Sequence, residues 1–458
     1  MKAHRVAAAL IGWFIAGSAA ADPIDDIVRG YMTAGHIPGV AVAVVDHGET
    51  RVLRTYGEAN LEWEGAVTPD TPFQIASASK IFTGVLLMRL AEKGSINLDA
   101  PLTDIFPEAP AGWSEITFRR MASHSSGLPE GLGLPSTASP EDFVREAMTR
   151  PLAYEPGTES RYGLTDFVVM TAALEKVTGL QFPDLLKREV LDPLGLTSTG
   201  FDYATEGRPM KPTALRRRAT TYVWGDNQQF EDGFLYPSHS YAAGGLYSSA
   251  RDLATLFSAI SKGEFLRPEN FRALTTAARL KDGRPGEFAI GWTAADYRGE
   301  QVFGHSGGPA LADILYTPRR DVTVIALTNQ RQFFPLLAQS VADTLWPAPP
   351  PRPALEDDAP SLTQTFSTTL SAAGEARLNA ESFNEQGRGS LDFLSHFGKA
   401  LLGAVGPVES VDLLSDTPRD KGRKRVYRVR FERREMIWVA TTDASGRFSE
   451  LRPGSDSD

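Results

Sequence analysis

Cysteine is absent from the 458 residues of this chain. Its absence excludes disulfides, thiolate catalysis, thiolate-bound metals and an N-terminal cysteine that could carry a lipid. A chain of this length can bury a core large enough to be stable without such cross-links. The sequence also contains neither a Gly-x-x-x-x-Gly-Lys phosphate loop nor a His-x-x-x-His pair. We therefore expect no metal, nucleotide or other cofactor.

Uninterrupted apolar runs of membrane-spanning length are missing as well. The longest apolar run near the start, Val6–Ala16, follows the basic residues Lys2 and Arg5 and precedes the small residues Ala19–Ala21. This pattern is typical of a secretory signal peptide, which is too short to span a bilayer. We predict that residues 1–21 are this signal peptide, cleaved after Ala21, and that the mature protein is periplasmic or secreted.

Basic residues are fewer than acidic ones, with 47 Lys and Arg against 57 Asp and Glu. The formal net charge is −10, and it becomes −12 once Lys2 and Arg5 leave with the signal peptide. An acidic surface argues against nucleic acid as a partner, because proteins that bind nucleic acid present basic patches. The one basic concentration lies between residues 419 and 434. We interpret it as the solvated face and turns of a sheet, with an anionic partner such as a cell-wall polymer or lipid surface as the alternative.

The composition changes once along the chain. A proline-rich stretch from Pro347 to Pro353 precedes the acidic residues Glu356–Asp358. Such a stretch is stiff and extended, and neither a helix nor a central strand could absorb it. We therefore place a linker at residues 347–360, between a long domain at residues 22–346 and a smaller module of unknown role at residues 361–458.

Strand patterns lie at both ends of the long domain. The apolar run Val40–Val45 is followed by a turn and by Val52–Leu53 as its hairpin partner. Further strands are predicted near the end of the domain, at Phe288–Trp292, Gln301–Gly304, Ala312–Tyr316 and Val322–Thr328. Residues 99–256 are rich in helical patterns, and a helix is predicted from Ser79 to Lys93. This order predicts an α+β domain whose sheet joins the two ends of the domain.

The final module is predicted to be a small α+β unit. Two helical stretches, 361–380 and 391–402, precede four strand-like runs, Glu409–Leu414, Arg425–Phe431, Met436–Thr441 and Phe448–Leu451. In the second run, Tyr427, Val429 and Phe431 alternate with arginines. This alternation indicates an antiparallel sheet with one face in water.

Ser77 and Lys80 form the most informative short motif of the chain. Residues i and i+3 of a helix share a face, with Cβ atoms about 5–6 Å apart, so the hydroxyl and the amine can meet. A nucleophile beside a base is the minimum that serine acyl transfer requires. Ser-x-x-Lys also occurs by chance at the start of an ordinary helix, so its context has to decide.

Four further stretches supply this context. Tyr162 lies in Ser160–Leu164, before a helical run, and His305 lies in Gly304–Gly308, after an apolar strand. The other two are Ser123–Pro129 and Ala242–Leu246. Together with Ile37–Ala43, Pro193–Leu196 and Leu327–Asn329, and in this order, they make the chain similar to the serine β-lactamase and penicillin-binding family. The resemblance is to its class C β-lactamase, D-aminopeptidase and esterase-like branch, and it extends from Asp22 to Leu345.

This resemblance implies a β-lactamase/transpeptidase-like fold, in which an antiparallel sheet is flanked by helices and carries a helical subdomain. It also implies that Ser77 attacks a carbonyl and forms an acyl-enzyme, which water or another acceptor releases. Lys80 would help as a base once burial lowers its pKa. Tyr162 would relay a proton between the nucleophile, the lysine and the leaving group.

The resemblance further implies a substrate-binding strand. His305 stands where many members of the family have lysine, and with Ser306 and Gly307 it would pair with an extended substrate. Backbone N–H groups of Ser77 and Gly308 would form the oxyanion hole. The implied partner is a small-molecule or peptide acyl substrate: a D-amino-acid peptide, a small ester or amide, or a β-lactam, with the cell wall as one source. The oligomeric state is not indicated.

Leu164 departs from the family pattern, which usually has asparagine two residues after the tyrosine. Losing an amide that contacts both the lysine and the substrate would cost about 1–3 kcal/mol if its partner stays buried. β-Lactam turnover is therefore doubtful. The main alternative is a catalytically weak or inactive ligand-binding or scaffold protein that retains the fold.

A second alternative uses the same residues differently. Gly304–Gly308 also fits Gly-x-Ser-x-Gly, the nucleophile elbow of α/β-hydrolases, with Ser306 as the nucleophile. That elbow needs a strand before it, a helix after it, and later an acid and a histidine. The sequence after Gly308 favours strands instead, and its only later histidine is His396, beyond the linker.

Aromatic residues gather in one stretch that is otherwise rich in Gly, Asp and Asn: Tyr222, Trp224, Phe230, Phe234, Tyr236 and Tyr241. They are predicted either to line the cleft that holds an acyl or peptide group or to pack under a loop. Of the remaining histidines, His124 is expected to hold backbone in a turn rather than to do chemistry.

Overall fold

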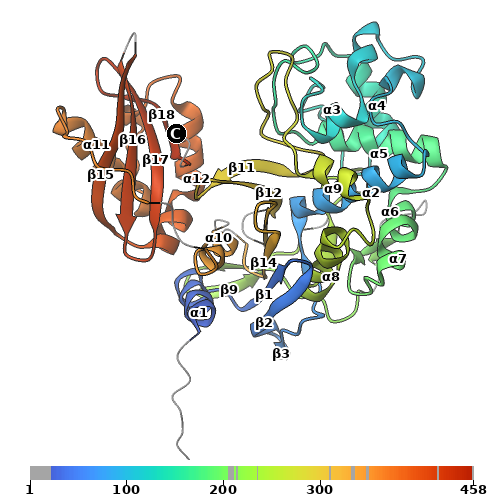
Figure 1. Ribbon diagram of the computed structural model, residues 1–458, viewed down its shortest axis with the longest axis horizontal. Coiled ribbons are helices and arrows are strands. Elements are labelled where there is room, and N and C mark those ends of the chain that lie inside the picture. The colour runs from blue at the N-terminus through green and yellow to red at the C-terminus, as the bar shows by residue number, and fades with distance from the viewer. Residues whose placement is uncertain are drawn as a thin grey trace, which may run out of the picture.

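The computed structural model describes residues 22–204, 211–212, 215–234, 236–308, 311–331, 336–346, 350–419, 422–455 and 458 (Figure 1). The predicted signal peptide, residues 1–21, lies outside the described residues. Within the described ranges, none of the helices is both long and apolar enough to cross a bilayer.

A seven-stranded sheet forms the centre of the long domain, in the order β11-β12-β13-β14-β1-β2-β3. Its strands are β1 (Gly39–Asp46), β2 (Glu49–Asn60), β3 (Gly65–Ala66), β11 (Thr293–Tyr297), β12 (Glu300–Gly307), β13 (Ala312–Thr317) and β14 (Val322–Thr328). All neighbours are antiparallel. Because β1 pairs with β14, with Val42 opposite Ala326, the sheet joins the two ends of the domain, as predicted.

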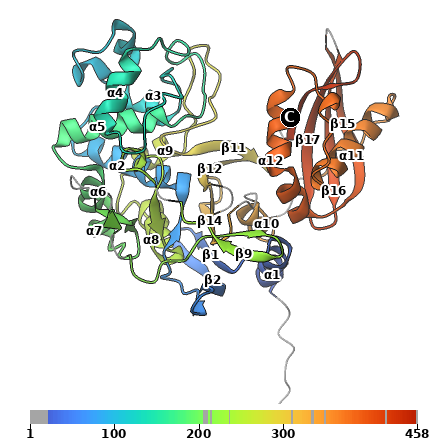
Figure 2. The same ribbon diagram turned by 180° about the vertical axis from the view of Figure 1, so that it is seen from behind.

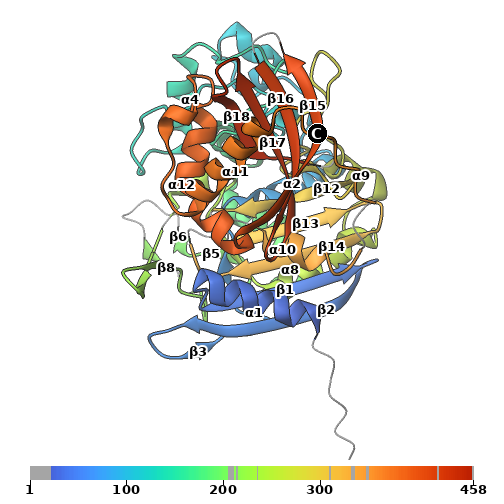
Figure 3. The same ribbon diagram turned by 90° about the vertical axis from the view of Figure 1, so that its left-hand side faces the viewer.

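Both faces of the sheet are buried, because alternate residues of a strand point to opposite sides. Ala41 and Ala43 of β1 pack into a core with α8 (Ala250–Ser261), whereas Val40 and Val42 pack with α1 (Pro23–Gly35) and α10 (Leu337–Ala342). Figure 3 shows α1 and α10 on the near side of the sheet. Two helical layers therefore enclose the sheet.

The remaining helices of this domain are α2 (Ser79–Glu92), α3 (Phe118–Ala122), α4 (Pro140–Met148), α5 (Thr165–Thr178), α6 (Phe182–Leu186), α7 (Asp192–Leu194) and α9 (Pro268–Leu274). Figures 1 and 2 show α3, α4 and α5 gathered on the side of the molecule that faces away from the C-terminal module. The family resemblance implied such a helical subdomain. Short strands connect it to the sheet: β4 (Phe73–Gln74), β10 (Leu246–Ser248) and β5 (Gly200–Phe201) in one small sheet, β6 (Tyr203–Ala204) with β7 (Lys211–Pro212), and β8 (Tyr222–Gly225) with β9 (Gln228–Glu231).

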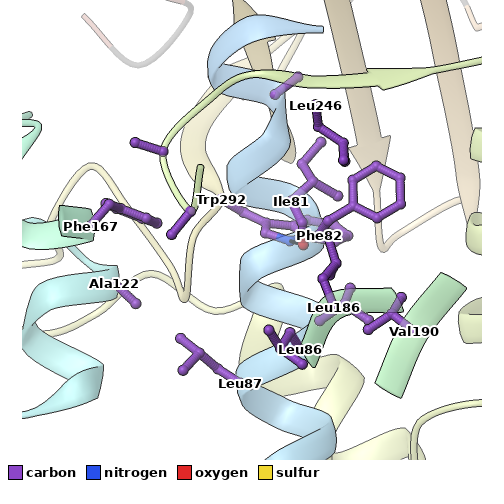
Figure 4. Packing of buried hydrophobic residues seen from close by; sticks show 14 of the residues in the cluster. Ile81, Phe82, Leu86, Leu87, Ala122, Phe167, Leu186, Val190, Leu246 and Trp292 are labelled. Carbon is purple, nitrogen blue, oxygen red and sulfur yellow. Dashed lines mark hydrogen bonds between the residues drawn. The ribbon is translucent and has the colours of Figure 1, made fainter. Parts of the chain in front are cut away.

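Helix α2 runs through the middle of the larger core. Figure 4 shows Ile81, Phe82 and Leu86 of this helix packed among Phe167 of α5 and Trp292. The helix is buried on nearly all sides, so its polar residues must find partners within the protein. This requirement limits the directions in which the side chain of Lys80 can point.

The prediction of a strand at Phe288–Trp292 is wrong. This segment is irregular apart from one isolated bridge, and β11 begins only at Thr293. It lies against α2 instead: a Cβ atom on Gly84 would come 2.2 Å from the carbonyl oxygen of Ile290. The indole N–H of Trp292 donates to the carbonyl of Ile81 at 3.3 Å. Its apolar residues are therefore buried against a helix rather than in the sheet.

The C-terminal module contains α11 (Pro360–Gly374), α12 (Arg388–Val405) and a four-stranded antiparallel sheet in the order β15-β16-β17-β18. The strands are β15 (Val408–Arg419), β16 (Gly422–Phe431), β17 (Glu435–Asp443) and β18 (Phe448–Pro453). Phe366 of α11 stacks on Tyr427 of β16 with ring centroids 4.2 Å apart. Helices on a small antiparallel sheet were predicted for this part of the chain.

The module shares a core with the long domain. One cluster of buried residues contains Val28 of α1, Val341 of α10, Leu401 of α12 and Trp438 of β17. The buried guanidinium of Arg434 also donates across this contact, to Ser340 Oγ at 2.9 Å. The module therefore packs on the α1 and α10 side of the central sheet. The domain boundary at residue 346 stays a prediction, and residues 347–349 lie outside the described part.

Acidic partners neutralise much of the basic concentration. Arg425 is 2% exposed and pairs with Asp357 at 3.0 Å and with Asp416 at 2.6 Å. Arg428 pairs with Asp412 at 2.7 Å. These contacts weigh against an anionic partner, but the prediction of a solvated face is wrong for Arg425, which is buried. They also hold the acidic end of the linker against the module.

Candidate active site

Ser77 lies in a single turn of 3-10 helix, Ala76–Ala78, immediately before α2. Ala76 has φ of 46°, in the left-handed region that few residues other than glycine adopt. The Ser79 hydroxyl holds the turn, since it donates to the carbonyl of Ala76 at 2.6 Å and accepts the N–H of Leu246 at 3.2 Å. Ser77 is partly exposed, whereas its neighbours are buried. The turn thus presents one hydroxyl to the solvent side.

The three residues predicted to be catalytic lie in hydrogen-bonding contact. The Lys80 amine donates to the Tyr162 hydroxyl at 2.7 Å, and this hydroxyl donates to Ser77 Oγ at 2.9 Å. Tyr162 comes from the loop before α5, 85 residues after Ser77 in the sequence. A continuous hydrogen-bonded path therefore connects the amine to the Ser77 hydroxyl through the phenol.

Lys80 is 2% exposed, and its ammonium group has little water around it. Burial lowers the pKa of Lys80 to about 7, because a charged amine loses its hydration. The amine also donates to the carbonyl oxygen of Ala243 at 2.8 Å. It lies over the rings of Tyr162 and Phe167, 4.8 and 5.0 Å from their centroids. Near pH 7 a substantial fraction of Lys80 is therefore neutral and able to accept a proton.

Tyr162 is half exposed, but its hydroxyl end lies inside, between Ser77 and Lys80. Its ring packs on His124, with centroids 4.6 Å apart, and faces Phe288 at 5.8 Å. Burial of the hydroxyl end raises the pKa of Tyr162, and the hydrogen bond to Ser77 opposes this shift. The phenol is therefore protonated at neutral pH, as a proton relay requires.

His305 lies on β12 with its ring centroid 6.0 Å from that of Tyr162. Its Nδ1 is 2.6 Å from the carbonyl oxygen of Ser306, which can only accept, so Nδ1 carries a hydrogen. Burial lowers the pKa of His305 to about 3, and the nearby Lys80 contributes to the shift. His305 is therefore neutral, and the site lacks the fixed positive charge of the lysine that it replaces.

The end of β12 lies directly against the Ser77 turn. A Cβ atom on Gly307 would come 1.9 Å from the carbonyl oxygen of Ile75, so a larger residue has no room there. A Cβ atom on Gly308 would lie 3.2 Å from that of Ala76. The predicted oxyanion-hole residues, Ser77 and Gly308, are thus on adjacent segments.

Ser306 faces the other side of the strand from His305, because side chains alternate. Its hydroxyl donates to Asp313 of β13 at 2.9 Å. The predicted contribution of Ser306 to substrate binding is therefore limited to its backbone. The nucleophile-elbow alternative is wrong, because residues 304–307 lie inside an antiparallel strand that is followed by β13 rather than by a helix.

Leu164 is the N-cap residue of α5 and is 41% exposed. The effect of having leucine rather than asparagine at this position stays a prediction. The Lys80 amine finds its partners elsewhere, in Tyr162 and the carbonyl of Ala243. Leu164 consequently leaves no unpaired donor on Lys80, and the case for an inactive protein becomes weaker.

The aromatic stretch divides into two groups. Tyr222 and Tyr241 are 2% and 1% exposed and belong to packed regions. Phe234, by contrast, is 42% exposed, and its ring meets that of Tyr236 edge-on at 4.8 Å. Tyr236 lies under the glycine pair before β10 and beside Gly308, where a Cβ atom would be 3.9 Å from its hydroxyl. Of the other two residues, Trp224 stacks on His36 with ring centroids 3.9 Å apart, and Phe230 is 41% exposed in β9. Tyr236 is thus the aromatic residue of this stretch found beside Gly308, and Phe234 adjoins it.

Sequence reasoning missed three groups around these residues. The carbonyl oxygen of Ala243 accepts a hydrogen bond from Lys80, whereas the sequence indicated only that the stretch Ala242–Leu246 belongs to the family pattern. His124 supports Tyr162 directly and does more than hold a turn. Asp166, which follows Tyr162 by 4 residues in the sequence, is buried and contacts His124. A carboxyl in an apolar helical run was the available signal for Asp166. Across the described ranges, no cluster of three His, Asp or Glu residues could hold a metal ion.

Comparisons with known proteins give a family match over most of the chain. The family model described as Beta-lactamase matches residues 24–344. Protein flp of Staphylococcus aureus is 26% identical over 187 residues, which is 39% of this chain and 38% of the length of flp. Putative beta-lactamase-like 1 of Homo sapiens is 30% identical over 360 residues, which is 72% of this chain and 69% of that protein.

Among solved structures, D-amino acid amidase from Ochrobactrum anthropi, crystallised with L-phenylalanine amide, superposes with a TM-score of 0.58. The alignment covers 71% of this chain and 99% of the amidase at 21% identity. At this identity the likeness establishes the fold, and it confirms the β-lactamase/transpeptidase-like fold that the sequence predicted.

Proposed function

The chain belongs to the β-lactamase family, and on that premise we propose that it is an exported serine hydrolase that forms an acyl-enzyme on Ser77. The observation that carries this proposal is the hydrogen-bonded path from the Lys80 amine through the Tyr162 hydroxyl to Ser77 Oγ. The signal-peptide pattern at residues 1–21 supports export to the periplasm or medium.

Acylation follows from the path. For Ser77 to attack, the two hydrogen bonds first reverse by rotation of the hydroxyls, so that Ser77 donates to Tyr162 and Tyr162 donates to the lone pair of the neutral amine. The serine proton then passes to the Tyr162 oxygen as the phenol proton passes to Lys80. The Ser77 oxygen then bonds to the carbonyl carbon, and the carbonyl π electrons move to its oxygen. Backbone N–H groups of Ser77 and Gly308 would receive that oxyanion.

Release reverses the path. The bond to the leaving group breaks as the oxyanion electrons return, and Tyr162 gives the leaving group a proton that Lys80 replaces. Water then attacks the acyl-enzyme while its proton moves through Tyr162 to Lys80. Collapse of the second intermediate frees the acid and returns the proton to Ser77. Each group ends in its starting state, so the cycle balances.

The site favours an acyl donor without a carboxylate beside the scissile bond. His305 is neutral, and Lys80 is largely neutral above pH 7, so neither offers a fixed charge to an anion. The exposed ring of Phe234, with Tyr236 beside it, offers a contact surface to an acyl side chain. The Arg331 guanidinium lies 5.0 Å from the centroid of the Phe234 ring but is already paired with Asp232 at 3.0 Å. We therefore propose esters and amides that carry no carboxylate, including D-amino-acid amides like the substrate named for the amidase relative, ahead of β-lactams.

A matched pair of substrates tests this choice. We expect the phenyl ester of phenylacetylglycine to have a kcat/KM at least about tenfold higher than its 3-carboxyphenyl ester, since the carboxylate loses hydration without gaining an ion pair. The His305→Lys variant should narrow this ratio. Equal rates for the two esters in the wild type would contradict the proposed substrate class, and nitrocefin and D-amino-acid anilides measured alongside would rank the remaining candidates.

The acid limb of the pH–rate profile should report Lys80. Because burial lowers the pKa of Lys80 to about 7, the fraction of neutral amine grows as the pH rises through 7. We expect kcat/KM to rise tenfold per pH unit below about pH 6.5 and to bend near pH 7. Initial rates from pH 5 to pH 7.5, corrected for spontaneous hydrolysis, measure this limb. A kcat/KM that still rises tenfold per pH unit at pH 7.5, with no bend, would show that Lys80 keeps its ordinary pKa and would contradict its assignment as the base.

A further inference from the structure

His124 holds the backbone on both sides of Tyr162. The N–H of Arg161 donates to the carbonyl of His124 at 2.8 Å, and the N–H of Gly163 donates to its Nδ1 at 3.3 Å. The His124 ring also packs on the Tyr162 ring, with centroids 4.6 Å apart. His124 itself is 1% exposed and has φ of 53°, so its own position is tightly constrained.

Asp166 in turn fixes the His124 ring. The residue is 4% exposed in the first turn of α5. Its Oδ2 lies 3.2 Å from His124 Nδ1, and its Oδ1 accepts a short hydrogen bond from the hydroxyl of Ser126. The Ser126 hydroxyl also accepts the N–H of Leu128 at 2.9 Å, so its own hydrogen is free to go to Asp166.

Donors and acceptors in this cluster locate one proton. A backbone N–H can only donate, so His124 Nδ1 must present a lone pair to Gly163. The contact between Nδ1 and Asp166 Oδ2 is then a hydrogen bond only if Oδ2 carries a hydrogen. Either tautomer of His124 leaves one N–H unpaired among the described residues: the buried Nε2–H if Nδ1 accepts, or the Gly163 N–H if Nδ1 donates. An Nδ1–H that donates to an ionised Asp166 would in addition bury a charge, so the arrangement with a protonated Asp166 is favoured.

We propose that protonated Asp166 and His124 form a positioning pair that holds the Tyr162 hydroxyl between Ser77 and Lys80. This inference rests on the proposed function, because it concerns the placement of its proton relay. Neither residue touches the substrate in this account. Their effect passes through the loop that carries Tyr162.

The charged surroundings agree with a neutral carboxyl. Burial raises the pKa of Asp166 to about 8, with Ser126 and Lys80 opposing the shift. Burial also lowers the pKa of His124 to about 3. Asp166 also interacts electrostatically with Glu130 and Tyr154. Burial is the main cause that raises the pKa of Glu130, and burial raises the pKa of Tyr154 to about 12. Above pH 8, therefore, Asp166 would ionise and face the lone pair of His124.

Two substitutions at position 166 separate positioning from mere packing. We expect Asp166→Leu to lower kcat about a hundredfold at pH 7 with little change in KM, because a phenol displaced by about 1 Å relays protons poorly. We expect Asp166→Asn to recover most of that loss, because its amide can donate to His124 and accept from Ser126. We expect kcat/KM of the wild type to fall above pH 8 as Asp166 ionises, and we expect the asparagine variant to lack this fall. An Asp166→Asn variant as impaired as Asp166→Leu, or with an unchanged alkaline limb, would overturn the proposal.

Thermal unfolding tests the protonation without any substrate. A carboxyl whose pKa is raised in the native state stabilises it fully only below the unfolded pKa of 3.8, and this contribution is lost as the pH rises to about 8. The Tm of Asp166→Asn should therefore exceed that of the wild type by a margin that grows from pH 4 to pH 8. A margin independent of pH would show that native Asp166 is ionised, and would overturn the proposal even if Ser77 proves catalytic.

Asp252→Asn serves as the matched control. Asp252, in the first turn of α8, is also buried, at 4% exposed, and burial raises its pKa. Its carboxylate accepts a hydrogen bond from the hydroxyl of Thr199 rather than contacting His124. Its variant should show a pH-dependent Tm margin of its own and retain the alkaline limb of kcat/KM. If Asp252→Asn also removed that limb, the limb would report global stability rather than the pair, and the proposal would fail. Should no substrate be turned over at all, the proposed function fails while the Tm comparison still decides the protonation of Asp166.

Discussion

The Ser77→Ala variant is expected to lose turnover of every acyl substrate, by at least about ten-thousandfold in kcat. The substitution removes the oxygen that bonds to the acyl group and leaves the rest of the path in place. It also frees the Tyr162 hydroxyl from one hydrogen bond at a partly exposed position, so the fold should be unaffected. Initial rates with the phenyl ester, together with Tm values, measure both effects.

Ser306→Ala is the matched control for this loss. The two serines differ in their surroundings, because the Ser306 hydroxyl donates to Asp313 away from Tyr162. Truncation of Ser306 leaves a buried carboxyl with one partner fewer, so a lower Tm is expected, with acyl-enzyme formation retained. Turnover that survives in Ser77→Ala would remove Ser77 as the nucleophile and contradict the proposed function.

Lys80→Met should lower kcat by about a thousandfold, the range that one general base contributes. Methionine fills a similar volume among the rings of Tyr162 and Phe167 but cannot accept a proton. The fold should tolerate the change, because the variant no longer has to bury an amine. Kinetics at pH 7 and pH 9 distinguish the loss of a base from a shifted pKa, since no pH restores the variant.

Lys176→Met provides the comparison for a lysine outside the site. Its amine is 4.0 Å from Glu108 on the surface, where an ion pair contributes little to stability. This variant should match the wild type in kcat. If Lys80→Met retained more than a tenth of the wild-type kcat, Lys80 would not be the general base, and the mechanism would need another proton acceptor.

Much of the sheet was predictable because its strands carry local signals. The run Val322–Thr328 is apolar, β-branched and bounded by polar residues, and the structure has β14 over the same residues. The order of strands, with β1 beside β14, followed from strand patterns at both ends of the domain. Phe288–Trp292 has a similar apolar pattern but lies against α2, and no local pattern distinguishes burial against a helix from burial in a sheet.

The candidate site was predictable only where a motif fixed the spacing. Ser77 and Lys80 are 3 residues apart, so geometry alone brings them to one region. Tyr162 was identified through family order, since nothing local shows that its hydroxyl reaches Lys80. The apolar run around Asp166 signalled a buried carboxyl but not its contact with His124, and no signal marked the carbonyl of Ala243, because both contacts depend on which segments meet around α2.

The contribution of the C-terminal module was likewise hidden from the sequence. The prolines of the linker indicated a separate unit, yet Leu401 and Trp438 share one core with Val28 of α1. An apolar residue in an amphipathic helix can pack on its own module or on a neighbour, and the pattern is the same in both cases. Arg434, predicted to lie on a solvated face, instead donates to Ser340 of α10.

The central claim is that Ser77 is the nucleophile, and covalent labelling tests it most directly. The purified protein is incubated with a fluorophosphonate probe at pH 8, digested, and mapped by mass spectrometry, with Ser77→Ala and Ser306→Ala treated in parallel. The account predicts one adduct per chain, on the peptide that contains Ser77, in the wild type and in Ser306→Ala and none in Ser77→Ala. An adduct on Ser306, or a wild-type protein that remains unlabelled while fully folded, would contradict it.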